Sequence, residues 1–173
     1  MSEASVSQGS QSARADNTVR RAVEAELPAL ALLWREGWHE AHDGLVPAAL
    51  SAIRTEASFL ERLKDMFDDI RVTGPVGSPT GFCTVKPGEL YQMYVSKAAR
   101  GTGAAAALMQ DGEARMAAAG TSRAFLLCVV ENLRAARFYE KQGWTLAHIG
   151  DETVDTGQGT VTFQLRRYEK DIL

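Results

Sequence analysis

Residues that build metal sites and disulfides are scarce in this 173-residue sequence, which has two cysteines and three histidines. Cys83 and Cys128 each lie inside an apolar run, a setting that argues against a disulfide scaffold and against a zinc site. The histidines are too scattered along the chain to predict a metal cluster. We therefore expect no metal site.

An excess of positive charge and long apolar runs are also lacking. The 19 Lys and Arg residues face 22 Asp and Glu residues, for a formal net charge of −3, so we expect no nucleic-acid partner. No run approaches the ~20 apolar residues that span a membrane, and the first residues lack the basic region and apolar core of a signal peptide. These absences predict a cytoplasmic protein without a membrane partner.

The composition that is present suits one globular domain, because 45% of the residues are hydrophobic and 24% are charged. Residues 1–16 differ from the rest, since they are rich in Ser, Gln and Ala and have few large apolar side chains. Such a segment cannot bury enough surface to offset its ordering entropy. We expect residues 1–16 to form a disordered N-terminal tail and residues 17–173 to form a single domain.

Hydrophobic spacing indicates a mixed arrangement of helices and strands. The expected order is β-α-α-β-β-β-α-β-α-β-β, with strands over 18–23, 70–73, 81–86, 89–95, 124–130, 144–149 and 160–166 and helices over 27–42, 55–67, 104–119 and 133–142. Turn residues between 70 and 95 favour an antiparallel meander, whereas the helix that connects 89–95 to 124–130 favours parallel pairing of those strands. The predicted fold class is therefore α/β with a mixed sheet.

A glycine-containing loop between a strand and a helix indicates an anion site. Its sequence is Arg100-Gly101-Thr102-Gly103-Ala104-Ala105. Glycines let the backbone approach a ligand closely, and the free N–H groups at a helix N-terminus bind anions such as pyrophosphate. Lys97 and Arg100 add positive charge at the same place in a chain that is acidic overall.

Two other phosphate-binding motifs fit this loop less well. Gly101, Gly103 and Ala106 match the spacing of the dinucleotide-binding motif, and Glu131 follows the next strand. That motif turns directly from its strand, whereas residues 96–100 intervene here, and the roughly 40 residues after Glu131 are too few to complete a doubly wound domain. The P-loop is excluded because the sequence has no Gly-Lys-Ser or Gly-Lys-Thr.

Three motifs in succession resemble the GNAT acetyltransferase superfamily. The strand Leu90-Tyr91-Gln92-Met93-Tyr94-Val95 precedes Arg100-x-x-Gly103-x-Ala105, which is similar to the family's Gln/Arg-x-x-Gly-x-Gly/Ala acetyl-CoA motif with alanine last. The third motif is Asn132-x-x-Ala135-x-x-Phe138-Tyr139-x-x-x-Gly143-Trp144, in which Trp144 replaces a phenylalanine of the family pattern. The motifs span residues 90–144, and the order of elements matches over 18–166.

The resemblance implies a GNAT-like acyl-CoA transferase fold and acetyl-CoA as co-substrate. In this fold the strands that end at Val95 and Val130 splay apart, the pantetheine arm lies in the wedge, and the pyrophosphate rests on the loop amides. The implied cofactor-binding residues are Met93, Tyr94, Val95, Arg100, Gly101, Thr102, Gly103, Ala104, Ala105 and Asn132. Asn132 is also expected to cap the last helix.

Two residues are candidates for catalysis. The resemblance implies that Tyr139 protonates the departing thiolate, whose pKa is near 8.5, although a core aromatic is the alternative for this residue. Some members of the family carry a catalytic glutamate on the strand that here begins with Glu89. The two-residue period places Glu89, Tyr91, Met93 and Val95 on one face, so Glu89 is the candidate base. A solvated charge beside the Pro87-Gly88 turn is its alternative.

The acceptor side is predicted from position alone. Trp38, His42 and Tyr91 are the expected substrate-binding residues, His39 is a further candidate, and the core is the alternative place for Trp38. The resemblance predicts an N-acetyltransferase in which a primary amine of a small molecule or a protein attacks the acetyl group directly. A non-catalytic acyl-CoA-binding module and a nucleotide-binding domain are the competing hypotheses. The sequence identifies neither the amine nor the oligomeric state, although the family often forms dimers.

Overall fold

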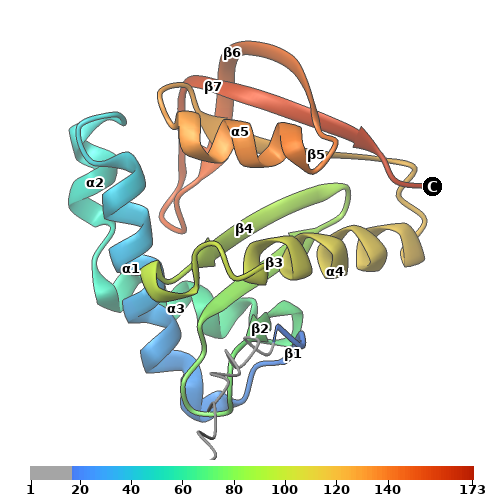
Figure 1. Ribbon diagram of the computed structural model, residues 1–173. Coiled ribbons are helices and arrows are strands. Elements are labelled where there is room, and N and C mark those ends of the chain that lie inside the picture. The colour runs from blue at the N-terminus through green and yellow to red at the C-terminus, as the bar shows by residue number, and fades with distance from the viewer. Residues whose placement is uncertain (1–16) are drawn as a thin grey trace, which may run out of the picture.

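The structure of the protein is a computed structural model, which describes residues 17–173, so the predicted tail over 1–16 lies outside the described residues. Seven strands form one sheet in the order β1-β2-β3-β4-β5-β7-β6 (Figure 1). The strands are β1 Arg20–Arg21, β2 Arg71–Thr73, β3 Gly81–Lys86, β4 Glu89–Val95, β5 Arg123–Val129, β6 Thr145–Asp155 and β7 Thr160–Asp171. The helices are α1 Leu27–His42, α2 Ala48–Ile53, α3 Glu56–Asp65, α4 Ala104–Ala118 and α5 Leu133–Lys141, with 3-10 turns at Glu24–Glu26, Phe67–Asp69 and Lys97–Ala99.

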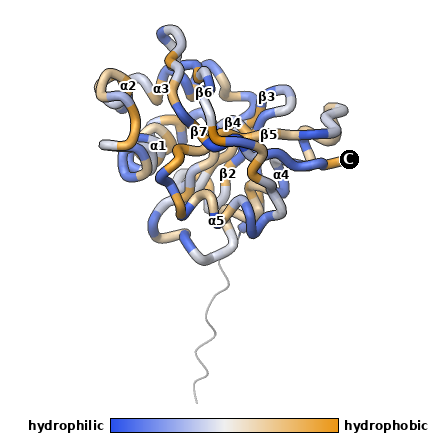
Figure 2. The backbone as a smooth tube through the Cα atoms, turned by 90° about the horizontal axis from the view of Figure 1, so that it is seen from above, coloured by the Kyte–Doolittle hydropathy of each residue, from blue (hydrophilic) through white to orange (hydrophobic). Residues whose placement is uncertain are grey.

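The helices cover the two faces of the sheet and divide the core into two layers. The first layer lies between α1–α3 and the sheet and is centred on Trp34, Phe59 and Phe82. The second lies between the sheet and the pair α4 and α5, and it contains Leu108 and Trp144. Viewed from above, α1, α2 and α3 gather at one end of the molecule, while the hydrophilic last part of β7 runs to the opposite edge (Figure 2). In the described part of the chain, no helix is both long and apolar enough to cross a membrane.

The predicted class and most of the predicted elements agree with the structure, and three elements differ. Helix α2 is absent from the sequence prediction, because six residues are too few to display a helical period. Strand β1 pairs over only two residues, because its neighbour β2 has only three. Strands β6 and β7 extend to Asp155 and Asp171, well beyond the predicted ends, because they pair along most of their length despite their many exposed polar side chains.

Strands β4 and β5 are parallel, as the crossover helix α4 predicts, and they diverge almost at once. Glu89 and Phe125 form the one residue pair between the two strands in the described sheet. Both strands then continue, β4 to Val95 and β5 to Val129, without further pairing. The sheet therefore opens between them, which agrees with the predicted splay.

A β-bulge in β4 divides its side chains between the two faces of the sheet. Leu90 pairs with Val85 and Gln92 pairs with Thr84, so Tyr91 is an extra residue without an opposite number on β3. The extra residue shifts the alternation, and the expectation that residues 89, 91, 93 and 95 share one face is wrong. Glu89 and Tyr91 face the α1–α3 layer, whereas Met93 and Val95 pack in the α4–α5 layer.

Candidate active site at the opened sheet

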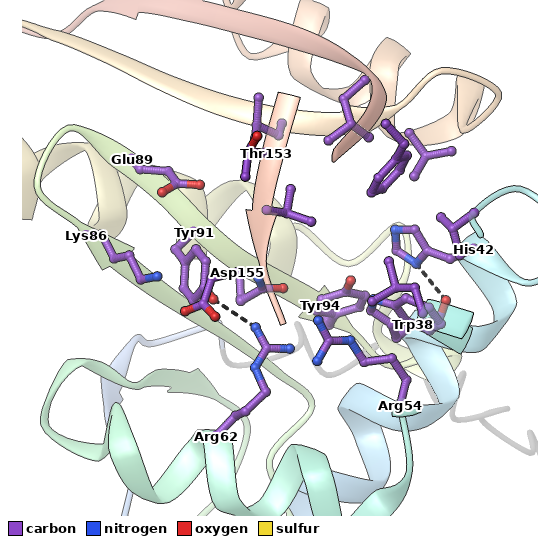
Figure 3. A pocket seen from close by; sticks show the side chains of 18 residues that line it. Trp38, His42, Arg54, Arg62, Lys86, Glu89, Tyr91, Tyr94, Thr153 and Asp155 are labelled. Atoms are coloured by element: carbon purple, nitrogen blue, oxygen red, sulfur yellow. Dashed lines mark hydrogen bonds between the residues drawn. The ribbon is translucent and has the colours of Figure 1, made fainter. Parts of the chain in front are cut away.

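Two cavities lie at the opening between β4 and β5, one on each face of the sheet. On the α4–α5 face is a groove of about 500 Å³, which we call the cofactor groove. It is lined by Met93, Val95, Ala99, Arg100, Gly101, Gly103, Ala105, Ala106, Arg134, Ala135, Phe138, Tyr139, Lys141 and Gln142. On the α1–α3 face is a smaller space of about 260 Å³, which we call the acceptor cavity (Figure 3). Strand β4 contributes residues to both, so its bulge determines which side chains reach each one.

The predicted anion loop forms one end of the cofactor groove. Gly101 and Gly103 have φ values of 76° and 96°, a left-handed conformation that favours glycine. Helix α4 begins directly afterwards at Ala104. Among the described residues, the amides of Gly103, Ala104 and Ala105 donate to no backbone carbonyl, as expected for the first turn of a helix. The loop thus offers several unpaired N–H groups to an anion.

The positive charge at this loop is already shared with a carboxylate that sequence analysis missed. Glu40, near the end of α1, accepts two hydrogen bonds from Arg100, at 3.0 and 2.7 Å. Lys97 and Arg134 lie 3.8 and 3.5 Å from the same carboxylate. The hydrogen bonds from Arg100 lower the pKa of Glu40 to about 2, so this carboxylate is ionised at neutral pH. No sequence signal connects Glu40 with Arg100, because 60 residues separate them.

Helix α5 forms the opposite wall of the cofactor groove. Asn132 caps this helix as predicted, because its side chain accepts a hydrogen bond of 3.2 Å from the amide of Ala135. Arg134, Phe138 and Lys141 line the groove, although the sequence analysis did not select them. They recur at steps of four and three residues after Asn132, so the helical period could have identified them.

Tyr139 also lines the cofactor groove, with its ring between Phe138 and Tyr168 at centroid distances of 5.7 and 5.8 Å. No side chain or carbonyl in the described part of the chain is hydrogen-bonded to its hydroxyl. Burial raises the pKa of the Tyr139 phenol above its usual value, so the hydroxyl keeps its proton. A protonated, unpaired hydroxyl in this position can donate a proton to a ligand in the groove.

Four of the predicted cofactor residues, Tyr94, Thr102, Ala104 and Asn132, do not line the groove. Tyr94 lies in the acceptor cavity, where its ring stacks on Phe82 at a centroid distance of 5.9 Å, because the bulge turns it to that face. The Thr102 hydroxyl donates to the carbonyl of Ala99 at 2.7 Å, and Ala104 is fully buried. Only the main chain of Tyr94, Thr102 and Ala104 is left for the predicted contact with a cofactor, and the side-chain oxygen of Asn132 is already bonded to the amide of Ala135.

The predicted substrate-binding residues Trp38, His42 and Tyr91 all line the acceptor cavity. His42 stacks on Trp38 at a centroid distance of 4.7 Å, and its Nδ1 lies 2.7 Å from the Trp38 carbonyl. A carbonyl only accepts, so Nδ1 carries the proton, and burial lowers the pKa of His42. The neutral ring therefore has a lone pair at Nε2. His39 does not line the cavity and instead bonds to Asp43 and to the carbonyl of Arg54.

Glu89 lines the acceptor cavity at the closed end of the opening. Burial raises the pKa of its carboxyl, and this effect exceeds the opposing attraction of Lys86 and Arg167. A carboxylate with a raised pKa is a better proton acceptor near neutral pH than an exposed one. The predicted base thus lies beside a cavity, rather than on the solvated turn that was its alternative.

Two arginines in the acceptor cavity were not anticipated. Arg54, after α2, and Arg62, on α3, are both buried, with 4% and 8% of their surface exposed. Sequence analysis gave no signal for them, because arginine is usually exposed and these two share no periodic pattern with apolar neighbours. In the part of the chain that the structure describes, no group of three His, Cys, Asp or Glu residues is arranged to hold a metal ion.

Comparison with known proteins agrees with this geometry. A comparison with curated protein sequences gives no match. Among solved structures, a GCN5-related N-acetyltransferase from Rhodopseudomonas palustris has 17% identity and a TM-score of 0.68, over 89% of this chain and 94% of that one. The yncA acetyltransferase from Salmonella typhimurium, solved with acetyl-CoA, has 16% identity and a TM-score of 0.65, over 90% and 94%. The PaiA N-acetyltransferase from Thermoplasma acidophilum, solved with coenzyme A, has 18% identity and a TM-score of 0.64, over 89% and 98%.

These structural similarities establish the fold. The sequence itself also matches a family model. The model of the acetyltransferase (GNAT) family matches residues 34–144, which is more than half of the chain. The matched segment includes the bulged strand β4, the anion loop and helix α5, and hence most of the lining of the cofactor groove. The chain therefore belongs to the GNAT family of acetyltransferases.

Proposed function

We propose that this protein transfers the acetyl group of acetyl-CoA to a primary amine that enters from the α1–α3 face. The main support is the opening between β4 and β5, which has an anion loop on one face and a polar cavity on the other. A thioester in the opening would be accessible to an amine from the acceptor cavity. Relatives from Salmonella typhimurium and Thermoplasma acidophilum, solved with acetyl-CoA and with coenzyme A, support the choice of cofactor.

The residues of the cofactor groove fit a pyrophosphate and an extended arm. The unpaired amides after Gly103 and the side chains of Arg100 and Arg134 would hold the phosphates. The main chain of Met93 and Val95 is free of pairing with β5 and would bond to the pantetheine arm. The cofactor supplies an acetyl group activated as a thioester, and the chain's own residues position the reactants and transfer protons.

Two proton transfers are required, and the two faces provide one candidate each. The amine must lose a proton before it attacks, and we assign this step to Glu89 because it combines a raised pKa with a place in the acceptor cavity. The neutral His42 ring offers Nε2 as a hydrogen-bond acceptor for the same amine. The thiolate leaves more readily when a hydroxyl shares its proton, and we assign this role to Tyr139.

Two measurements test this proposal against the competing hypotheses. Acetyl-CoA should raise the melting temperature while NAD should not, because only a ligand that binds the folded state stabilises it. Release of free coenzyme A should then depend on an added primary amine from a chemically diverse library. Stabilisation by NAD alone would favour a nucleotide-binding domain. Stabilisation by acetyl-CoA without amine-dependent release across the library would favour a non-catalytic acyl-CoA-binding module.

A further inference from the structure

The acceptor cavity contains two buried guanidinium groups that point toward one another. Arg54 enters from the end of α2 and Arg62 from α3, and Figure 3 shows both head groups in the space between these helices and β4. Arg54 lies 5.9 Å from the ring of Trp38, and Arg62 lies 4.6 Å from the ring of Trp34. The aromatic faces orient the guanidinium planes and offset part of the cost of burying two charges.

The hydrogen bonds of these two side chains are incomplete. A guanidinium has five N–H donors. Arg54 donates from Nη1 to the carbonyl of Thr156 at 2.8 Å, and Arg62 donates from Nη2 to the hydroxyl of Tyr91 at 2.8 Å. The Nε of Arg54 is buried without any partner. Most of the donors therefore lack an acceptor.

Their positive charges are also unpaired. Among residues 17–173, no carboxylate lies within 4.0 Å of either guanidinium, although Asp155 and Glu89 line the same cavity. Burial, and then the charge of Arg62, lower the pKa of Arg54 to about 10. Buried charges are normally paired, because desolvation without a counter-charge is costly. The arrangement lacks an anion that can accept several N–H groups at once.

We propose that Arg54 and Arg62 bind the carboxylate of the acceptor, so that the acceptor is a small amine of the amino-acid type. The inference rests on the proposed function, because it takes this cavity as the acceptor site. A carboxylate has about four lone-pair positions and matches the planar fork of arginine. The volume of about 260 Å³ favours a small molecule over a protein segment.

The charge of the cavity favours an acceptor with an anionic group. Three cationic side chains, Arg54, Arg62 and Lys86, face the two carboxylates of Glu89 and Asp155, which leaves one net positive charge. Transfer of the amine proton to Glu89 leaves the total charge of the cavity and its ligand unchanged. A carboxylate also occupies less of the space of about 260 Å³ than a tetrahedral phosphonate does.

The direct test is equilibrium binding to the full chain saturated with coenzyme A, which cannot react. The twenty common amino acids are titrated by calorimetry, and the tightest binder is compared with its amide, its decarboxylated amine and its aminophosphonate analogue. We expect the carboxylate form to bind at least about tenfold more tightly than each analogue. Equal binding of the amide or the amine, tighter binding of the phosphonate, or no binding of any amino acid would overturn the inference.

Variants separate this inference from the proposed function. Arg62→Gln should lose the preference for carboxylate over amide in the calorimetric titration. Arg54→Lys, which keeps the charge of this buried side chain, should reduce the same preference because lysine lacks the planar fork. Arg35→Gln, on α1, where Arg35 pairs with Glu56 and does not line the cavity, is the matched control and should leave the preference unchanged. A preference unaltered in both cavity variants would contradict the assignment, whereas failure of every amine would contradict the proposed function.

Discussion

Substitution of Gly103 separates the effect of charge at the anion loop from the effect of backbone strain. Its φ of 96° is unfavourable for other residues, and a Cβ at this position would lie 3.1 Å from Nδ2 of Asn17. Asn tolerates the left-handed conformation better than most residues, whereas a typical side chain costs about 1–2 kcal/mol there. Gly103→Asn and Gly103→Asp introduce side chains of nearly equal size, so the difference between their affinities for acetyl-CoA measures the effect of the negative charge.

The magnitude follows from the position of the loop. A carboxylate roughly 5 Å from a phosphate oxygen costs about 1–3 kcal/mol at effective dielectric constants between those of water and a protein surface. We therefore expect Gly103→Asp to bind acetyl-CoA at least about tenfold more weakly than Gly103→Asn. Calorimetric titration at low salt measures the ratio, and a repeat at high salt should reduce it because screening shortens the range of the charge. Equal affinity of the two folded variants at low salt would refute the assignment of this loop to the pyrophosphate.

Five further substitutions test catalysis and stability. Tyr139→Phe should leave acetyl-CoA affinity nearly unchanged and lower kcat by ~10²-fold, whereas unchanged kcat with a small loss of stability would indicate a core tyrosine. Glu89→Gln should lower kcat at neutral pH and remove the acidic limb of the pH–rate profile, and burial of Glu89 places this limb above pH 4.5 in the wild type. An unchanged profile would show that another group is the base, and His42→Gln would test the nearest alternative. Glu26→Gln should lower the free energy of unfolding by about 3 kcal/mol at neutral pH, because its hydrogen bonds lower the folded-state pKa from 4.5 to about 2. This contribution is complete above pH 4.5 and disappears as the pH falls toward 2, so urea titrations at pH 7 and pH 2 should show a large and then a negligible difference from wild type. Gly37→Ala should cost about 1–3 kcal/mol despite the better helix propensity of alanine, because the new Cβ would lie 2.8 Å from the Tyr94 ring; a more stable variant in thermal unfolding would contradict this.

Local sequence patterns predicted most of the elements and several of the residues that line the cofactor groove. The spacing of Leu30, Trp34 and Trp38 predicts the buried side of α1, and the glycines of the anion loop mark the start of α4. These features depend on residues a few positions apart, which is the range over which helical period and backbone conformation operate.

Contacts between distant segments could not be predicted in the same way. The pairing of Glu40 with Arg100 requires the end of α1 to lie beside the anion loop, and no property of either residue alone indicates this. In the acceptor cavity, Arg54 is hydrogen-bonded to the carbonyl of Thr156, at the tip of the β6–β7 hairpin, and no local pattern connects these two residues. The bulge at Tyr91 depends on which residues of β3 lie opposite, so the simple two-residue period placed Met93 and Val95 on the wrong face.

Because of the bulge, β4 cannot lose a residue without a change in the side chains that it presents to the acceptor cavity. Removal of Tyr91 would restore regular pairing with β3 and keep Met93 and Val95 opposite Cys83 and Gly81, but it would delete the extra side chain that the strand turns toward the acceptor cavity. In chimeras with other members of the family, both junctions should therefore fall outside residues 89–95, so that this strand is inherited intact from one parent.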